Sequence, residues 1–383
     1  MNEKFLSTVA YAIETGNTQL FDFLLKDFDS LDKETKNEIL DAAVRKTTSP
    51  DFLQHVFDYG FDLSYKDKLG FNLLHIAVAN NTKEIVHFLI QKGFDINETT
   101  NSGDNVISIA ASFTEHVEVI EELLNAGADI NTINKEGETL LSASAAYNPN
   151  PKITQFFIDK ELDIEARDKD SFTPLLNAAY HQENTDVIDV LTNAGADINA
   201  TTDDGRTMYH LAAYNSNPDV VRFISFAFFP SMVDNDGISC FTAALLSANS
   251  PQVMKLYLRK LKEEHLRFAC LNPNAEILEV LIQNSYDINS TDIDGITTLM
   301  RAANGNTNPD IIRMLLYYDA IWNCTDSKGR TVLHYAAANT DPAIYNWILE
   351  GDDVPPVDFK SLVSIKDNLG NTADYYLTHK EEF

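Results

Sequence analysis

A turn glycine followed by a short apolar segment recurs along this chain at a nearly constant spacing, and this period constrains the fold more than any other feature. The aligned positions are Gly70, Gly103, Gly137, Ser171, Gly205, Gly237, Gly295, Gly329 and Gly370, at intervals of 33, 34, 34, 34, 32, 58, 34 and 41 residues. A second marker, an apolar turn, recurs with the same period as GFDIN at 93, GADIN at 127 and 195, ELDIE at 161 and SYDIN at 285. Such self-similarity is typical of stacked structural repeats.

Each repeat has the pattern of two short helices. In one of them Asn72 precedes the apolar segment LLHIAV, and apolar residues between 85 and 90 recur with helical spacing. A helix pair of this size cannot bury its apolar face alone, so neighbouring units must stack to close a core. The sequence therefore predicts an all-α solenoid of about eleven helix-turn-helix units.

We expect residues 1–383 to form one solenoid made of four stretches. These are helix pairs without the glycine turn (1–64), regular repeats (65–222), degenerate repeats (223–290), and regular repeats that contain a loop insertion at 350–365 and end in a C-terminal cap (291–383). Within the degenerate stretch, 223–233 reads FISFAFFPSMV where a polar turn is expected. Two alternatives stay open for it: burial by a local distortion, or an exposed apolar patch.

The repeats resemble the ankyrin repeat over essentially all of residues 4–383. The residues that carry the resemblance are FTPLLNAA from Phe172, TVLHYAA from Thr331 and the two GADIN turns. Asn/Pro turns such as Asn148-Pro149 are similar to those of bacterial members of the family. The resemblance implies short β-hairpin fingers, a concave groove that carries variable contacts, and a histidine that joins one unit to the next, here His75, His210 and His334.

The charge of the chain restricts the class of partner. There are 58 acidic and 29 basic residues, which gives a formal net charge of −29. A surface of this sign repels phosphates, so nucleic acid is not expected as a partner, and a basic protein segment is. No apolar run approaches the roughly 18 residues of a membrane span, and the start of the chain lacks the pattern of an export signal. Three scattered cysteines indicate a reducing compartment, so we expect a cytoplasmic protein with no membrane contact.

Motifs for catalysis or metal binding are missing from the sequence pattern. No Cys-x-x-Cys, phosphate-binding glycine loop or Gly-x-Ser-x-Gly occurs, and the Asp-rich turn 290–295 has Arg301 where a calcium loop needs its closing glutamate. We therefore predict a protein that is not an enzyme and that has no catalytic residue, cofactor or metal.

Two sets of apolar residues are the candidate binding site. Aromatic residues stand at the end of the first helix in four successive units, where the resemblance places the groove; they are Phe113, Tyr147, Tyr180 with His181 beside it, and Tyr214. Finger tips supply the second set, expected to be exposed: Leu69, Phe71, Phe172, Ile238, Ile293 and Ile296. Large rings at such positions suit an interface hot spot, although rings that merely line the groove and bind nothing are an equal alternative.

The sequence thus predicts a monomeric, non-enzymatic scaffold that binds one protein partner, with a basic or extended segment of that partner held in a groove centred on residues 100–235. Two alternatives stay open. One is a secreted host-directed effector, or an inhibitor or immunity protein that blocks an enzyme. The other is an enzyme with an unrecognised site in 350–365 or 223–233.

Overall fold

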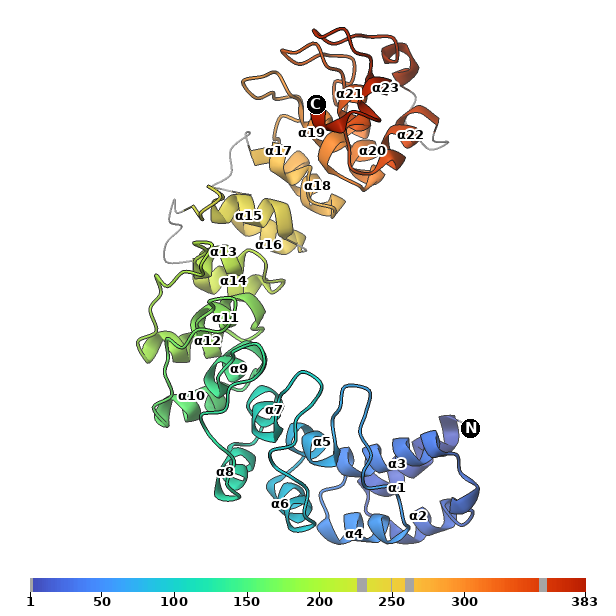
Figure 1. Cartoon of the computed structure of the whole chain (residues 1–383), viewed down its shortest axis with the longest axis vertical. Helices are drawn as coiled ribbons and strands as arrows, with labels where there is room; N and C mark the ends of the chain where they lie inside the picture. Colours follow the sequence, from blue (N-terminus) through green and yellow to red (C-terminus); the bar gives the residue numbers. More distant parts are fainter. Residues whose placement is uncertain (1–2, 226–232, 249, 259–264, 351–356) are drawn as a thin grey trace. The chain divides into compact units, whose positions relative to one another are not determined.

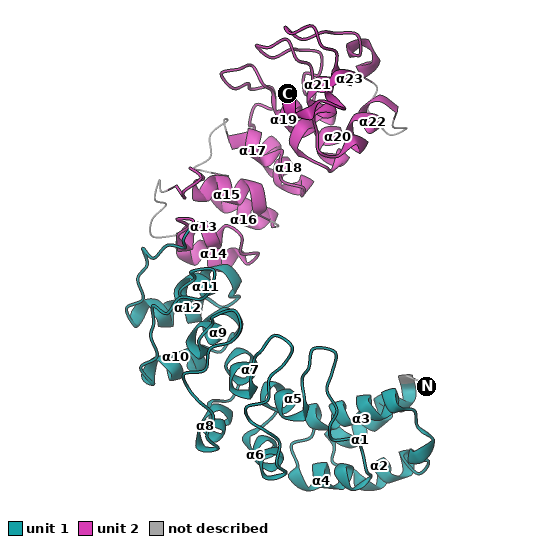
Figure 2. Ribbon diagram, viewed as in Figure 1, with its two compact units in different colours: residues 1–203 teal, residues 204–383 magenta. Residues whose placement is uncertain are grey.

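The computed structural model describes residues 3–225, 233–248, 250–258, 265–350 and 357–383, and the regular secondary structure of these residues is almost entirely α-helical (Figure 1). They divide into two compact units, residues 1–203 and residues 204–383 (Figure 2). None of the described helices is long and apolar enough to cross a membrane. The predicted all-α repeat fold is confirmed, while one continuous solenoid over 1–383 stays a prediction.

Unit 1 contains two rows of helices. The first helix of each repeat packs on the first helix of the next, from α1 through α3, α5, α7 and α9 to α11, and α4, α6, α8, α10 and α12 form the second row (Figure 1). The helices are α1 (Glu3–Glu14), α2 (Thr18–Leu24), α3 (Lys33–Lys46), α4 (Pro50–Asp58), α5 (Leu73–Asn80), α6 (Lys83–Gln91), α7 (Val106–Phe113), α8 (Val117–Asn125), α9 (Leu140–Tyr147), α10 (Pro151–Asp159), α11 (Pro174–His181) and α12 (Thr185–Asn193).

Unit 2 repeats this arrangement around its own apolar core. Buried residues between 213 and 376 form one cluster that runs through its helices. The helices are α13 (Met208–Ala212), α14 (Pro218–Ser225), α15 (Cys240–Ser247), α16 (Pro251–Tyr257), α17 (Leu266–Ala269), α18 (Ala275–Gln283), α19 (Thr298–Gly305), α20 (Pro309–Tyr317), α21 (Val332–Ala337), α22 (Pro342–Glu350) and α23 (Ala373–Tyr376). Most of 223–233 and part of the 350–365 insertion lie outside the described residues.

The helix starts explain the Asn/Pro turns. In α10 the Asn150 side chain accepts a hydrogen bond from the Lys152 amide at 3.1 Å, and Pro151 is the first helical residue. The same arrangement begins α20, where Asn308 caps and Pro309 follows. Proline is favoured at this position because its missing N–H would be unpaired in any case, and asparagine satisfies one of the free amides. These turns are therefore structural.

Buried amide side chains join neighbouring units at the other end of the first helices. The Asn148 Nδ2 donates to the carbonyl oxygens of Ala111 at 3.0 Å and Thr114 at 2.9 Å, both in the preceding unit. Equivalent pairs of bonds are made by Asn81, Gln182, Asn272, Asn306 and Asn339. Since these carbonyls end helices and lie inside the protein, the amides satisfy groups that would otherwise be buried without partners.

The fingers are tighter than the hairpins that the resemblance implies. Each of six fingers is closed by a single antiparallel bridge, as between Lys66 and Asn72, and the described part of these fingers has no longer strand pairing. Successive fingers also bond to each other, for example from the Lys169 amide to the Glu136 carbonyl oxygen at 2.9 Å. At Gly137, with φ 83°, an added Cβ would lie 3.0 Å from the Lys169 amide nitrogen, so the close contact between fingers favours glycine.

Candidate protein-binding surface

Exposed aromatic side chains end the first helices of three successive repeats in unit 1. Phe113, Tyr147 and His181 are the last residues of α7, α9 and α11, and Tyr180 precedes His181. The exposed fractions are 50% for Phe113, 42% for Tyr147 and 38% for Tyr180, and His181 is exposed as well. By position, therefore, His181 continues the series that Phe113 and Tyr147 begin. We call these four residues the aromatic row.

Ring contacts join three members of this row to a finger residue. The ring centroids of Tyr147 and His181 are 5.3 Å apart, and those of Tyr180 and His181 are 4.6 Å apart. Phe172, from the finger before α11, meets Tyr180 edge to face at 6.0 Å. The rings thus support one another and still keep a large exposed area, which is the combination found in rigid aromatic anchors of interfaces.

The finger residues fall into two groups. Leu69 and Ile293 are exposed, at 65% and 100%. The expectation of exposure is wrong for Phe71, Phe172, Ile238 and Ile296, which are half-buried. Each of these four directly follows the turn residue, where the chain bends back towards its own helix. Phe71 accordingly packs on the His75 ring at 5.7 Å, and the two isoleucines pack on the core of unit 2.

An open cavity of about 420 Å³ brings part of both sets together in unit 1. Its lining residues are Arg45, Asp67, Leu69, Phe71, Ile76, Ala79, Asn80 and Phe113. The finger and the first member of the aromatic row therefore border one hollow. Pockets with apolar walls and a few polar groups are the usual shape of a site for a side chain of a partner.

Tyr214 differs from the other predicted aromatic residues. It belongs to unit 2, is half-buried against the core of that unit, and has the Arg206 guanidinium 5.7 Å from its ring centroid. It lies two residues beyond the end of α13 rather than at its last turn, and it matches Tyr180, not Phe113 or Tyr147, in distance from the helix start. Its surroundings are those of a packed residue.

A row of carboxylates runs beside the aromatic row, and sequence reasoning missed it. The Asn134 Nδ2 donates to Asp104 Oδ1 at 2.9 Å and to Glu138 Oε2 at 2.8 Å, and the Tyr147 hydroxyl donates to Glu138 Oε1 at 3.3 Å. Asp104 and Glu138 both follow a turn glycine, which is the position that Phe71 and Phe172 occupy in their repeats. Comparing that position across the repeats would have found them.

These carboxylates interact strongly with their surroundings. Burial raises the pKa of Glu138, and the nearby negative charges of Asp168 and Asp104 raise it further, whereas hydrogen bonds from Asn134 and Tyr147 partly oppose this. Burial and the same acidic groups raise the pKa of Tyr147 to about 12. Desolvation by its neighbours lowers the pKa of His181, which favours a neutral imidazole. The site is therefore negatively charged and poorly hydrated at neutral pH.

No cationic nitrogen within the described residues lies within 4.0 Å of the carboxylates of Asp104, Glu138 or Asp168. Asp168 is bonded by the neutral amide of Asn177, whose Nδ2 donates to Oδ2 at 3.0 Å. We call Asp104, Glu138 and Asp168 the acidic row. Its partners are amides and the hydroxyls of Ser102 and Tyr147, so its charge is not compensated by an ion pair.

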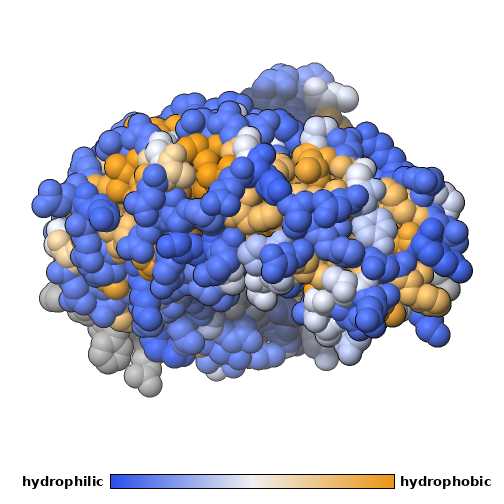
Figure 3. All heavy atoms as spheres, turned by 90° about the horizontal axis from the view of Figure 1, so that it is seen from below, coloured by the Kyte–Doolittle hydropathy of each residue, from blue (hydrophilic) through white to orange (hydrophobic). Residues whose placement is uncertain are grey.

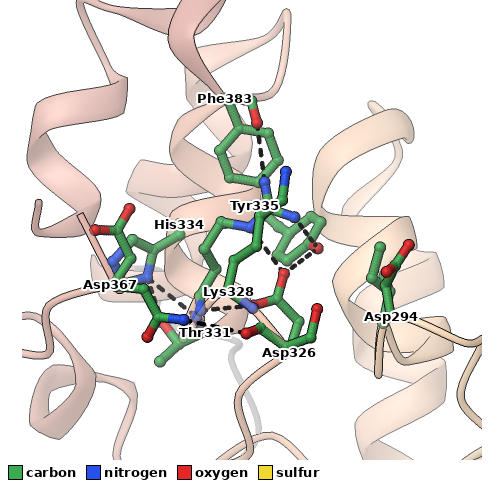
Figure 4. A network of polar contacts seen from close by, with 12 residues as sticks. Asp294, Asp326, Lys328, Thr331, His334, Tyr335, Asp367 and Phe383 are labelled. Atoms are coloured by element: carbon green, nitrogen blue, oxygen red, sulfur yellow. Dashed lines mark hydrogen bonds and ion pairs between the residues drawn. The ribbon is translucent and has the colours of Figure 1, made fainter.

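In unit 2 a finger carboxylate has a different environment (Figure 4). Asp326 has a fully buried side chain and accepts hydrogen bonds from the Arg330 Nε and the Tyr335 hydroxyl, both at 2.7 Å. Arg330 in turn donates to the main-chain oxygen of Phe383 at 2.9 Å. This network joins the finger of one repeat to Phe383.

A family model made of three ankyrin repeats matches residues 39–134, 107–202, 140–234 and 266–358, which together span well over half of the chain. The chain belongs to the ankyrin repeat family. Ankyrin repeats generally mediate protein–protein interaction and are typically not enzymes.

Two relatives are similar over short stretches. A 96-residue stretch is 34% identical to a Rickettsia felis protein named as an ankyrin repeat protein, and it covers 25% of this chain and 25% of that protein. A 60-residue stretch is 32% identical to an ankyrin repeat protein of Acanthamoeba polyphaga mimivirus and covers 16% of this chain and 8% of that protein. The chain thus matches a quarter or less of the length of these relatives.

The histidines expected of ankyrin repeats are structural. In both His210 and His334, Nδ1 bonds to the capping threonine of the same helix. The Nε2 of His210 bonds to the Ile238 carbonyl oxygen of the next unit at 3.0 Å, and the Nε2 of His334 bonds to the Asn371 carbonyl oxygen at 3.2 Å. His75 has the same capping bond to Asn72, although its Nε2 is buried without a partner. The histidine link between units is therefore seen for two of the three predicted residues.

In the part of the chain that the structure describes, no cluster of three or more His, Cys, Asp or Glu side chains is placed to hold a metal ion. Cys240 and Cys270 are buried, and burial raises the pKa of the Cys240 thiol to about 11. Cys324 is only partly buried.

Proposed function

We propose that this ankyrin repeat protein binds a protein partner through unit 1, on the surface formed by the aromatic row and the acidic row. The observation that carries the proposal is the adjacency of the two rows, since exposed rings that support one another stand beside carboxylates without counter-ions. Rings that only filled space in the core would be buried, whereas these keep a large exposed area.

The partner is expected to present an extended basic segment. Rings and carboxylates come from successive repeats, so the contacts recur along the row of units rather than meeting at one point, and an extended chain suits such a series. The net charge of −29 adds long-range attraction for a basic partner. Figure 3 shows one face on which hydrophilic residues predominate, with hydrophobic patches between them.

The test is capture of proteins from an extract of the cells that express the chain, followed by quantitative mass spectrometry. The variant replaces Phe113, Tyr147 and Tyr180 by Ala. The matched control replaces Tyr11, Phe23 and Tyr317, which are also exposed, at 59%, 68% and 77%, and lie elsewhere.

The amount of partner captured by the Phe113, Tyr147 and Tyr180 variant is expected to fall at least about tenfold, because hot-spot rings contribute about 2 kcal/mol or more each. The control variant is expected to capture as much partner as the unchanged protein. Both must retain the thermal transition of the unchanged protein. Equal capture by all three proteins would show that the surface is wrongly assigned. The identity of the captured protein also separates a housekeeping partner from an enzyme that the chain inhibits.

A further inference from the structure

Unit 2 pairs three of its finger aspartates with its own arginines, whereas a fourth, Asp367, accepts a hydrogen bond from the Tyr376 hydroxyl. Three aspartates that stand three residues before a turn glycine are paired in this way: Asp234 with Arg206 at 3.7 Å, Asp292 with Arg301, and Asp326 with Arg330 at 2.7 Å. Asp168 in unit 1 has the same position before Ser171, yet Asn177 stands where Arg301 stands in its repeat. A neutral amide replaces the guanidinium there, so the negative charge remains.

Arg330 shows how this fold holds a guanidinium group. Besides its bond to Asp326, the guanidinium carbon lies 5.0 Å from the Tyr335 ring centroid and 4.3 Å from the Phe383 ring centroid. One carboxylate and two rings thus surround a planar cation. Arginine suits such a site better than lysine because it is planar, weakly hydrated and able to stack on rings.

Unit 1 also brings a carboxylate and two rings together, from other positions of the repeat and without an arginine, since Glu138 follows the turn glycine where Arg330 does in its own repeat. The half-buried Glu138 carboxylate lies against the Tyr147 hydroxyl, and the Tyr147 ring meets that of His181. Asp104 and Asp168 are close enough to act on the ionisation of Glu138 and Tyr147. Like charges in a partly desolvated site destabilise one another, and a cation that enters relieves this repulsion.

We propose that Glu138, Tyr147 and His181 form a seat for one arginine side chain of the partner segment, with Glu138 binding the guanidinium and the two rings stacking against it. This inference rests on the proposed function, because it names the side chain that the surface recognises. Asp104 and Asp168 add attraction from either side. Phe113 and the cavity beside Leu69 then receive an apolar residue of the same segment.

The test measures binding of fluorescein-labelled Gly/Ser peptides of twelve residues by anisotropy at low salt. The three peptides differ only at two positions. One peptide has arginine at both, one has lysine at both, and one has citrulline, the uncharged isostere of arginine, at both. The variants are Glu138→Gln and the matched control Glu136→Gln, which removes the same charge from the exposed tip of the same finger.

The arginine peptide is expected to bind most tightly, the lysine peptide several-fold more weakly, and the citrulline peptide least. Glu138→Gln is expected to weaken binding of the arginine peptide about tenfold, which is the effect of losing one charge-assisted hydrogen bond. Glu136→Gln is expected to weaken it less than about twofold. Replacing Tyr147 by Ala is expected to reduce the preference for arginine over lysine, which a purely structural ring would not do.

The inference is overturned if citrulline and arginine peptides bind alike, if the two Gln variants weaken binding equally, or if no arginine peptide binds at millimolar concentration. These failures are distinguishable from failure of the proposed function. If the triple aromatic variant loses the cellular partner while Glu138→Gln keeps it, the surface is right and the arginine seat is wrong. If the triple variant keeps the partner, the surface itself is wrong.

Discussion

The two units of this chain use the same fingers in opposite ways. In unit 2 three finger carboxylates, those of Asp234, Asp292 and Asp326, are paired with arginines of the same unit, and the Asp326 network is buried. A fourth, Asp367, accepts a hydrogen bond from the Tyr376 hydroxyl instead. In unit 1 the acidic row has only amide and hydroxyl partners and lies beside exposed rings. A repeat therefore keeps its backbone and its caps while a few substitutions at the finger decide between an internal contact and a surface for a partner.

The largest effect is expected from breaking the paired side of this comparison. Asp326→Ala leaves the Arg330 guanidinium, whose side chain is 8% exposed, without its counter-ion and removes the acceptor of the Tyr335 hydroxyl. Losing one partner of a buried ion pair costs about 3–5 kcal/mol. Urea denaturation should show this loss, and hydrogen exchange should place it in unit 2. Asp168→Ala in unit 1 is the matched control, and an equal loss there would contradict the comparison.

A second prediction concerns what the units share. Asn148→Ala in unit 1 and Asn306→Ala in unit 2 each remove two bonds to buried carbonyl oxygens of the preceding unit. Each is expected to cost about 1–3 kcal/mol, because the carbonyls are left without partners. The two losses in free energy of unfolding should be similar. A much smaller value in one unit would show that the amide bonds are not common to both.

The pH dependence of stability should have opposite signs in the two units. Burial and acidic neighbours raise the pKa of Glu138, so its ionised form is unfavourable in the folded state and stability is gained as pH falls through that pKa towards 4.5. Burial by itself raises the pKa of Asp326, but bonds from the Arg330 amide, the Tyr335 hydroxyl and the guanidinium outweigh it and lower the pKa. The stability that ionised Asp326 contributes is present above about pH 3.8 and is lost as the pH falls further.

Glu138→Gln is accordingly expected to raise the melting temperature slightly at pH 7, within the range of about 0.5 kcal/mol typical of surface changes, and to have no effect below pH 4.5. Asp326→Asn should lower it at pH 7, and the loss should shrink in acid. Thermal melts of both variants between pH 3 and 7 provide the measurement. Parallel pH profiles would refute the assignment of opposite environments.

A similarly small effect is expected at turns that depart from glycine in both units. Glu161 and Ser285 have φ values of 62° and 66° at the position where other repeats have a glycine, such as Gly127. A left-handed conformation is unfavourable for residues with a Cβ, so Glu161→Gly and Ser285→Gly should each stabilise the protein by less than about 1 kcal/mol. Loss of stability in either variant would mean that the side chain contributes a contact that outweighs the strain.

The sequence by itself determined the repeat, the helix pairs and the approximate location of the aromatic residues. Turn glycines and Asn, Thr or Pro at helix starts act within a few residues, so their spacing in the chain is enough to place helices. The position of Ser171 in the glycine series was read correctly for this reason, since it has a φ of 63°. Exposure was predicted less well, because Phe71 and Phe172 turn back onto their own repeats.

Only the tertiary structure decided which finger acids are paired. Asp168 and Asp326 occupy equivalent places in the repeat, yet Asp168 is bonded by Asn177 and Asp326 by Arg330, which stand at different positions of their repeats. Arg330 is held in turn by Phe383, which lies 53 residues further along the chain. Charge compensation depends on distances of a few ångströms between side chains, which spacing along the chain does not give. The pattern of helices and turns is therefore set by local sequence and can be predicted from it. The acidic residues beside Tyr147 come together only because neighbouring repeats stack.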